Sequence, residues 1–236
     1  DFFHNVSKVS KADKGPVFKF IHLTGAHGPF QLDSSLQFSP DSSYLDQFEG
    51  ALWGIDKLLQ EMKAAEVYDN SLIFITGDHG STYPWDVGNE FRKSATNLML
   101  NGMPLLLVKG FNEVNDKLET SNAPVSLMDI PNSVMDALSL DNQLPGVSIF
   151  KEIHQDRKRI FYFYEWFDAD WSSDFVPPLY KVEVVGDASD RQSWHFSGEE
   201  LAGAGQISLW PLHYKYGENI ISESNLYMEL YSIGFD

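Results

Sequence analysis

One apolar run that ends in an acidic residue and a histidine limits what this chain can fold into. The run Leu72–Ile75 is short, continuous and bounded by turn residues, which is typical of a strand buried on both faces of a mostly parallel sheet. Gly77 and Gly80 bracket Asp78 and His79 and let the backbone turn there. Ligands in open α/β sheets gather at the carboxyl ends of strands. We therefore expect Asp78 and His79 to lie at such an edge, where a metal ion can bind.

The two side chains offer a carboxylate oxygen and an imidazole nitrogen, which are suitable ligands for zinc or manganese. Magnesium and calcium are alternatives, although the nitrogen of His79 favours zinc or manganese. Two ligands hold a divalent ion poorly, so the pair predicts only part of a metal site. The alternative interpretation is that Asp78 caps the following segment and His79 is an ordinary loop histidine.

Composition excludes several classes of protein. With 236 residues, of which 43% are hydrophobic, the chain can bury a sizeable core as one large domain or as a domain with a small appendage. Lys and Arg number 17 against 34 Asp and Glu, a net charge of -17, so we expect no nucleic-acid partner. Cysteine is absent, which removes disulfides, thiolate catalysis and cysteine-based zinc sites. No apolar stretch approaches the roughly 18 to 20 residues that span a bilayer.

The first part of the chain predicts a strand, a helix and a second strand. Val17–Leu23 is largely apolar and leads into the glycine-rich turn Thr24–Phe30. Ser42 or Ser43 is expected to begin a helix. Its apolar residues recur at three- and four-residue steps and are expected to face the core: Leu45, Phe48, Leu52, Ile55, Leu59 and Met62. With Leu72–Ile75, these elements predict a right-handed strand-helix-strand unit.

Later segments predict further strands and one helix. Pro104–Lys109 is another short apolar run, and Pro124–Leu138 indicates a helix that Pro131 breaks or kinks. After Phe150 the chain becomes rich in aromatic residues. Strands are expected at Ile160–Trp166, Leu179–Val185, Ser193–Phe196, Ile207–Trp210 and Leu226–Tyr231. We therefore predict an α/β domain over residues 1–150, with a mostly parallel sheet flanked by helices, and a small antiparallel β subdomain over residues 151–236 that packs on it.

Several segments, in this order, resemble the sulfatase-like branch of the alkaline phosphatase superfamily. They are Phe20–Phe30 (FIHLTGAHGPF), the helix end near Glu66–Ser71, Ile73–Gly80 (IFITGDHG), Pro104–Gly110 (PLLLVKG) and Ser126–Pro131 (SLMDIP). Within that branch the chain looks closest to the bacterial lipoteichoic acid synthases and phosphoethanolamine transferases, whose His-Gly-Pro and Asp-His-Gly segments have similar spacing. The resemblance covers roughly Val17 to Phe150. It implies that residues 1–150 are the C-terminal part of an incomplete alkaline phosphatase-like catalytic domain.

The resemblance also implies roles for individual residues. Asp78 and His79 match metal ligands of the family, and His27 matches the histidine that contacts the phosphate or sulfate group. Arg92 or Lys93 could take the place of a substrate-binding basic residue found beyond the metal loop in sulfatases; the alternative is a solvated basic pair. His22 lies in the same stretch as His27, but we expect it to be a satisfied structural histidine.

The chain also departs from the family pattern. The nucleophile of the family, a Thr, Ser or modified Cys, and its accompanying acidic ligand come from strands that precede the His-Gly-Pro segment, and the residues before Val17 show no such motif. The phosphoethanolamine transferases carry a further histidine soon after Asp-His-Gly, whereas here the next one is His154. The chain opens on Asp-Phe-Phe-His-Asn. We expect a piece of a longer protein, inactive alone, whose N-terminal remainder completes the site.

The implied activity is metal-dependent transfer or hydrolysis of a phosphate or sulfate ester, lipid- or glycan-linked, such as cell-envelope glycerophosphate or phosphoethanolamine groups. The resemblance places it in the extracytoplasmic ectodomain of a membrane-anchored bacterial protein. The non-catalytic alternatives are a pseudoenzyme and a module that binds cell-wall glycans. In the latter, sugars would stack on the aromatic residues Phe161, Tyr162, Phe163, Tyr164, Trp166, Trp171 and Trp194. Strand alternation favours core packing for most of these rings.

Overall fold

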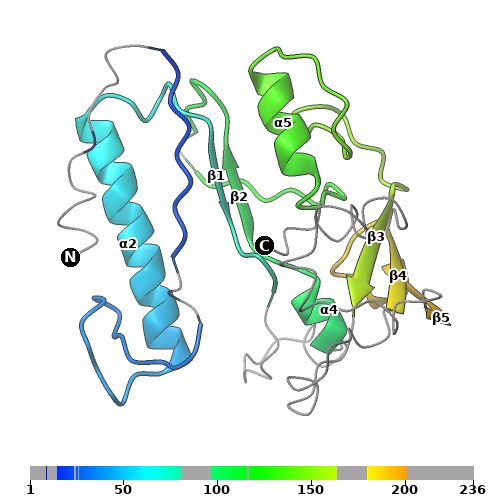
Figure 1. Ribbon diagram of the computed structural model, residues 1–236, viewed down its shortest axis with the longest axis horizontal. Helices are drawn as coiled ribbons and strands as arrows, with labels where there is room; N and C mark the ends of the chain where they lie inside the picture. Colours follow the sequence, from blue (N-terminus) through cyan, green and yellow to red (C-terminus); the bar gives the residue numbers. More distant parts are fainter. Residues whose placement is uncertain are drawn as a thin grey trace, which may run out of the picture. The chain divides into compact units, whose positions relative to one another are not determined.

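The computed structural model describes residue 9 and residues 15–23, 25, 27–80, 97–115, 117–163 and 180–200 (Figure 1). The chain divides into two compact units. The first unit comprises residues 1–71 and 109–116, and the second comprises residues 72–108 and 117–236. This division differs from the predicted boundary at residue 150, which stays a prediction. Within the described ranges, no helix is both long and apolar enough to cross a membrane.

The first unit contains the long helix α2 (Tyr44–Ala64). Ser43 is its N-cap: the Asp46 N–H donates to the Ser43 hydroxyl oxygen at 3.1 Å, and the Ser43 N–H donates to the Asp46 carboxylate at 2.9 Å. This reciprocal capping box satisfies donors that a helix start leaves without partners. At the other end, the N–H of Ala65 donates to the carbonyl of Glu61. The predicted helix and its start at the serine pair are confirmed.

The buried face of α2 is not the predicted one. Its buried residues are Gln47, Gly50 and Gly54, whereas Leu45 and Leu52 of the predicted apolar stripe are exposed. The other members of that stripe are half-buried: Phe48, Ile55, Leu59 and Met62. The reason is that loop backbone approaches the helix very closely. A Cβ added at Gly50 would lie 2.6 Å from the backbone carbonyl oxygen of Asp33, in the loop that precedes α2, so only glycine fits there.

The predicted strand Val17–Leu23 has no strand pairing within the part of the chain that the structure describes. Most of its apolar side chains are exposed, with Phe18 at 85% and Phe20 at 82%, whereas Leu23 is half-buried. A strand requires a neighbour that accepts and donates its ladder hydrogen bonds, and no described strand pairs with this segment. The predicted strand-helix-strand unit is therefore wrong for the described residues.

The second part of the chain contains two short paired strands, β1 (Ile73–Thr76) and β2 (Leu106–Lys109). Both strands were predicted, and both are confirmed. The N–H of Gly77 donates to the carbonyl of Leu105 at 3.1 Å, which joins the end of β1 to the start of β2, so the pair runs antiparallel. The mostly parallel sheet is not found in the described residues, because a short apolar run indicates burial and not strand direction.

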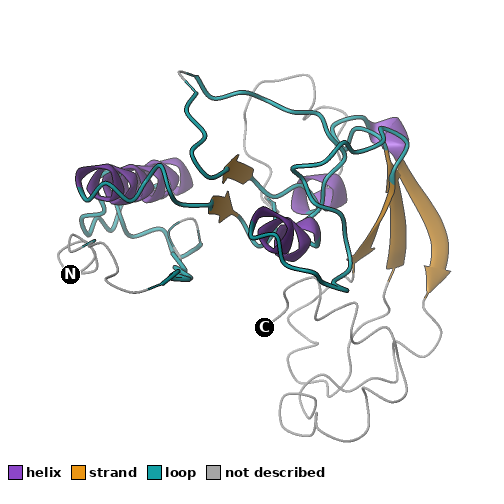
Figure 2. Cartoon of the chain, turned by 90° about the horizontal axis from the view of Figure 1, so that it is seen from above, coloured by secondary structure: helices purple, strands orange, loops and turns teal. Residues whose placement is uncertain are grey.

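A three-stranded sheet follows, with β3 (Lys158–Phe163), β4 (Tyr180–Val185) and β5 (Trp194–Glu200) in that order. Both pairs are antiparallel, and the strands lie side by side in both views (Figures 1 and 2). The expected antiparallel sheet is confirmed for these strands. The predicted strands Ile207–Trp210 and Leu226–Tyr231 lie outside the described residues.

One face of this sheet forms a small core. Val182, Val184 and Trp194 are buried, and the ring of Phe161 meets that of Trp194 edge to face, with centroids 6.2 Å apart. The indole N–H of Trp194 donates to the carbonyl of Ala188 at 2.8 Å, so its polar atom is satisfied inside the core. Packing of these two aromatic rings agrees with the prediction of core positions.

Helix α5 (Asp129–Ala137) is shorter than predicted. The sequence predicted a helix from Pro124 with a break at Pro131, but the helix begins at Asp129 and Pro131 lies in its first turn. Proline is tolerated there because the first N–H groups of a helix have no intrahelical partner. The proline is therefore compatible with the start of the helix and does not break it.

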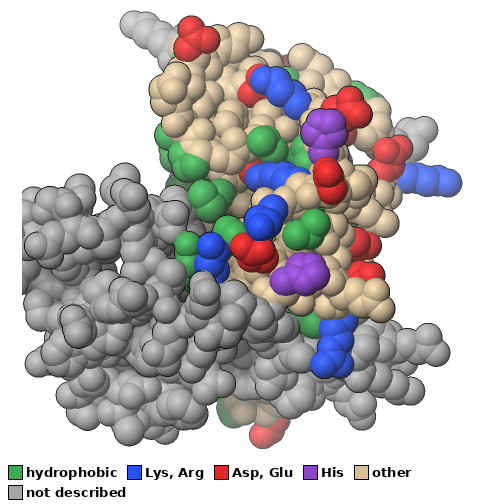
Figure 3. Space-filling model, turned by 90° about the vertical axis from the view of Figure 1, so that its right-hand side faces the viewer, with side chains coloured by type: hydrophobic (Ala, Val, Ile, Leu, Met, Phe, Trp, Pro, Cys, Tyr) green, Lys and Arg blue, Asp and Glu red, His purple; other side chains and the backbone are tan. Residues whose placement is uncertain are grey.

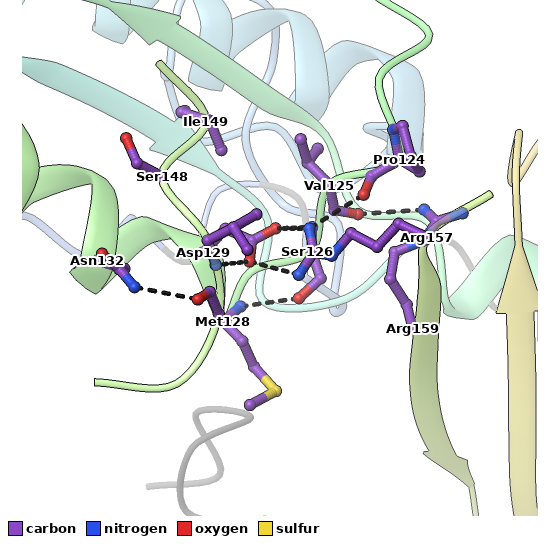
Figure 4. A network of polar contacts seen from close by, with 12 residues as sticks. Pro124, Val125, Ser126, Met128, Asp129, Asn132, Ser148, Ile149, Arg157 and Arg159 are labelled. Atoms are coloured by element: carbon purple, nitrogen blue, oxygen red, sulfur yellow. Dashed lines mark hydrogen bonds and ion pairs between the residues drawn. The ribbon is translucent and has the colours of Figure 1, made fainter. Parts of the chain in front are cut away.

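Asp129 is the centre of a buried polar network (Figure 4). Its fully buried carboxylate accepts both guanidinium nitrogens of Arg157, at 2.6 and 2.7 Å, and the backbone N–H groups of Ser126 and Val147. The charge is thus both paired and hydrogen-bonded, which burial requires. This network joins the start of α5 to the residue just before β3, so the Ser126–Pro131 segment has a structural role here.

Candidate functional site

His27 lies in the loop that precedes α2, and its ring tautomer follows from its contacts. Its Nδ1 atom lies 2.5 Å from the carbonyl oxygen of Gly28. A carbonyl oxygen can only accept, so Nδ1 carries a hydrogen and donates it. In the neutral ring the lone pair is then on Nε2. Since the side chain is exposed, Nε2 is the ring atom through which His27 can meet a ligand.

A buried glutamine on α2 holds the loop that carries His27. Gln47 is only 3% exposed. Its amide nitrogen donates to the carbonyl of His27 at 2.7 Å, and its amide oxygen accepts from the backbone N–H groups of Gln31 at 2.9 Å and Leu32 at 3.1 Å. All of these partners are backbone groups of one loop, so a single side chain fixes both ends of the segment from His27 to Leu32.

Sequence reasoning missed Gln47, although a signal was present. Gly50 and Gly54 follow it at steps of three and seven residues, which places all of them on one face of α2. Glycine in a helix interior costs up to about 1 kcal/mol relative to alanine. Two glycines on one face therefore indicate a close backbone approach, and a polar residue among them is a candidate to bind that backbone.

The rest of the loop is also held by local hydrogen bonds. Leu32 and Phe38 form an isolated antiparallel bridge. The carboxylate of Asp33 accepts from the N–H groups of Ser35 at 2.8 Å and Gln37 at 3.0 Å, as short acidic side chains often do in turns. The backbone that follows His27 is therefore a defined turn that packs on α2.

Asp78 and His79 follow β1 in the second unit. The Nδ1 atom of His79 lies 2.6 Å from the carbonyl oxygen of Gly80, so by the same reasoning Nδ1 carries the hydrogen and Nε2 the lone pair. The side chains of Asp78 and His79 are 81% and 53% exposed, and the Oδ1 atom of Asp78 lies 3.9 Å from the Nε2 atom of His79. The same oxygen accepts the backbone N–H of His79 at 3.0 Å.

This donor pair fits two ligands of a divalent metal ion. Zinc bonds to nitrogen and oxygen are about 2.0 to 2.2 Å long, so donors of one ion lie less than about 4.4 Å apart, and the 3.9 Å separation meets that limit. The hydrogen bond at Nδ1 also fixes the tautomer that leaves Nε2 to bind metal. In the described residues, however, no group of three or more His, Cys, Asp or Glu could hold an ion. The pair is part of a site.

Backbone contacts hold the turn that carries the pair. On one side, the N–H of Gly77 donates to the carbonyl of Leu105. On the other, the N–H of Gly80 donates at 2.6 Å to the carbonyl of Asn101, the last residue of the short helix α4 (Asn97–Asn101). A Cβ added at Gly80 would lie only 1.9 Å from the carbonyl oxygen of Leu100. The close contact with α4 therefore requires glycine at this position.

The other predicted site residues are not described together with this pair. Arg92 and Lys93 lie outside the described residues. His22 is exposed, so its prediction as a satisfied structural histidine receives no support. His27 belongs to the first unit, and Asp78 and His79 belong to the second. The structure thus describes two parts of the candidate site separately.

The side of the second unit that carries β3, β4 and β5 shows acidic and basic side chains interspersed (Figure 3). Lys158 pairs with Glu183 across two of these strands at 2.9 Å, and the hydrogen bond from Lys158 lowers the pKa of Glu183. Lys151 likewise pairs with Asp136. The basic groups of these pairs are neutralised by neighbours, so they do not form an anion-binding patch.

Comparison with known proteins identifies the family. A family model described as Sulfatase matches residues 1–140, which is more than half of the chain. Neither a curated protein nor a solved structure matches the chain. Sulfatases have an alkaline phosphatase-like α/β fold and are generally metal-dependent. The matched range includes His27, Asp78 and His79, and this chain therefore belongs to the sulfatase family, in the sulfatase-like branch of the alkaline phosphatase superfamily.

Proposed function

We propose that this chain provides two metal ligands and an anion-contacting histidine to an enzyme that transfers or hydrolyses phosphate or sulfate esters. The observation that carries the proposal is the donor pair at the end of β1, in which Asp78 Oδ1 and His79 Nε2 lie 3.9 Å apart and exposed. Membership of a family that is generally metal-dependent supports it. The nucleophile and the remaining ligands are proposed to come from an N-terminal remainder of a longer protein.

Asp78 and His79 would hold the ion, with zinc or manganese favoured and magnesium or calcium as alternatives. When bound, such an ion neutralises charge on the transferred group and lowers the pKa of a hydroxyl nucleophile. Asp78 contributes a negative charge and His79 a neutral nitrogen. Because a protonated imidazole has no lone pair, metal binding should weaken as pH falls.

His27 has the opposite protonation requirement. Its Nδ1 hydrogen is donated to Gly28, so a neutral ring presents only a lone pair at Nε2. The protonated ring can donate from Nε2 to a non-bridging oxygen of the ester or give its proton to the departing alkoxide. His79 is thus proposed to act when neutral and His27 when protonated.

The substrate class and cellular location are further parts of the proposal. They rest on the likeness of the His-Gly-Pro and Asp-His-Gly segments to lipoteichoic acid synthases and phosphoethanolamine transferases. We propose a lipid- or glycan-linked ester of the bacterial cell envelope, with glycerophosphate or phosphoethanolamine as the transferred group, and a membrane-anchored, extracytoplasmic protein. A glycan-binding module is less well supported, because Phe161 and Trp194 pack against each other and Trp194 is buried.

Metal analysis of the full-length protein tests the proposal. Plasma mass spectrometry should find a divalent ion in the wild type and in a matched control, Asp141→Ala, which removes an exposed carboxylate elsewhere in the second unit. Asp78→Ala should lose the ion. Turnover of aryl phosphate, aryl phosphodiester and aryl sulfate probes should be lost together with the metal, and the preferred probe separates phosphate from sulfate chemistry.

Other outcomes would contradict the proposal in different ways. A metal-free wild type would remove its basis. Bound metal without turnover of any of the ester probes would indicate a pseudoenzyme. Retention of cell-wall glycans by this chain, without metal, would indicate a binding module.

A further inference from the structure

We infer that Gln47 is a positioning residue for His27, which it holds by a hydrogen bond from its buried amide to the His27 carbonyl. The inference rests on the proposed role of His27 at the transferred group. If Gln47 positions His27, then the activity of His27 depends on a residue of helix α2. That residue has no contact with substrate in the proposed reaction.

The contacts determine the orientation of the Gln47 amide. The carbonyl of His27 can only accept, so the amide nitrogen must face it, and the N–H groups of Gln31 and Leu32 can only donate, so the amide oxygen must face them. The side chain therefore uses both halves of its amide on one loop. At 3% exposure, water cannot readily replace these bonds, and their loss would leave buried backbone groups without partners.

Few other side chains could replace glutamine at this position. Glutamate keeps two acceptor oxygens for Gln31 and Leu32 but has no donor for the carbonyl of His27 when ionised. Methionine has a similar length and forms none of these bonds. Ionised glutamate thus loses the bond to His27 and places a charge against its carbonyl, protonated glutamate can donate there in place of the amide, and methionine forms none of these bonds.

Loss of the Gln47 side chain should shift the backbone of His27, because Gln47 binds the loop at His27 and again at Gln31 and Leu32. The distance from the His27 backbone to the Nε2 atom is fixed by the side chain, so a shift of the backbone carries Nε2 with it. Misplacement of a reacting group by about 1 Å can cost on the order of a hundredfold in rate. The turn that carries the metal pair would keep the hydrogen bonds of Gly77 to Leu105 and of Gly80 to Asn101, so the ion should stay bound.

The test compares Gln47→Met and Gln47→Glu in the full-length protein with the control Gln60→Met. Gln60 lies on the same helix but is exposed, and its amide bonds to Asp56. Measurements are kcat, KM, metal content, circular dichroism and amide hydrogen exchange at Gln31 and Leu32. We expect kcat to fall about 10- to 100-fold in both Gln47 variants, with KM and metal content nearly unchanged, and no effect of the control.

The exchange data distinguish the two variants. Gln47→Met should expose the amides of Gln31 and Leu32 to exchange, whereas Gln47→Glu should keep them protected and still lose rate. If Gln47→Met does not fold, the glutamate variant carries the test alone. Wild-type kcat in Gln47→Glu at a pH at which its carboxylate is ionised would overturn the inference.

A double-mutant cycle with His27→Ala separates positioning from general stability. If Gln47 acts through His27, the change Gln47→Met should have no further effect on kcat once His27 is alanine. Equal losses in both backgrounds would overturn the inference. If wild-type protein turns over no ester, the proposed function fails. Amide exchange then decides on Gln47: unchanged exchange at Gln31 and Leu32 in the methionine variant would contradict it.

Discussion

The two histidine turns of this chain share one local geometry but are supported in different ways. In each, ring Nδ1 donates to the carbonyl of the following glycine, Gly28 after His27 and Gly80 after His79. The first turn is held by a buried side chain from a helix, Gln47. The second is held by backbone contacts at its flanking glycines, and its acidic and imidazole side chains remain exposed.

The difference agrees with the separate tasks proposed for the two turns. A hydrogen-bond donor to a transition state is effective only if it is already in place, because each such bond is weak and directional. A metal ion binds its ligands strongly and can orient exposed side chains as it binds. The proposed anion contact therefore requires prior support within this chain, whereas the proposed metal ligands can be ordered by the ion itself.

Replacement of the two histidines should give the largest effects and separate the turns. His79→Ala in the full-length protein should lose the metal and lower kcat by about a thousandfold or more, since bound metal contributes several kcal/mol to the transition state. His27→Ala should lower kcat by about a hundredfold and keep the metal. Metal analysis and steady-state kinetics check both. Loss of the ion from His27→Ala would contradict the proposed separation of metal binding at one turn from anion contact at the other.

Replacement of Gly80 or Gly50 by alanine should disturb the backbone contacts that hold each turn, with effects smaller than those of the histidine variants. In Gly80→Ala the new Cβ would lie 1.9 Å from the Leu100 carbonyl oxygen, and in Gly50→Ala it would lie 2.6 Å from that of Asp33. Backbone must move in each case. We expect Gly80→Ala to weaken metal affinity about 10- to 100-fold, as for other supporting contacts of metal ligands, and Gly50→Ala to lower kcat about tenfold with metal affinity unchanged.

Calorimetric metal titration and kinetics on the same two variants measure these effects, and each glycine serves as the control for the other. If both variants lost metal affinity to the same degree, the two turns would not be supported independently.

Local features of the fold were predictable from the sequence. The start of α2 at Ser43 and the strands β1 and β2 were found because caps and short bounded apolar runs depend on neighbouring residues only. The turn that carries Asp78 and His79 was predicted to follow a strand for the same reason. The strands β3, β4 and β5 were also placed, with shifts of a few residues at their ends.

Features that depend on distant partners were not predictable. The prediction of the buried face of α2 was wrong because a loop, and not another apolar surface, packs on Gly50. The antiparallel pairing of β1 with β2 depends on which strands meet, and so does the lack of a partner for Val17–Leu23 among the described strands. The partners of Gln47 are backbone groups, which carry no sequence signal of their own, so its role was indicated only by the spacing of Gly50 and Gly54 on the same helix face.

The smallest expected effect is a loss of thermal stability in acid, caused by protonation of the carboxylate that caps α2. The side-chain hydrogen bond from Ser43, followed by the one from its backbone N–H, lowers the pKa of Asp46 below its ordinary value of 3.8. A lowered folded-state pKa means that this carboxylate stabilises the protein above pH 3.8 and that the stabilisation is lost as pH falls through the folded value. Asp46→Asn should lower Tm slightly at neutral pH and leave it equal to wild type in strong acid.

Thermal unfolding of both proteins from neutral pH down to about pH 2 measures this difference. Asp56→Asn is the matched control, because Asp56 lies on the exposed part of the same helix and accepts a hydrogen bond from Gln60. Since Gln47 directly follows Asp46, loosening of the cap in acid should speed amide exchange at Gln31 and Leu32 before it does so at Gly80. Equal acceleration at all of these amides would show that acid acts on the whole molecule, and that the support of His27 by α2 is not separable from that of the metal pair.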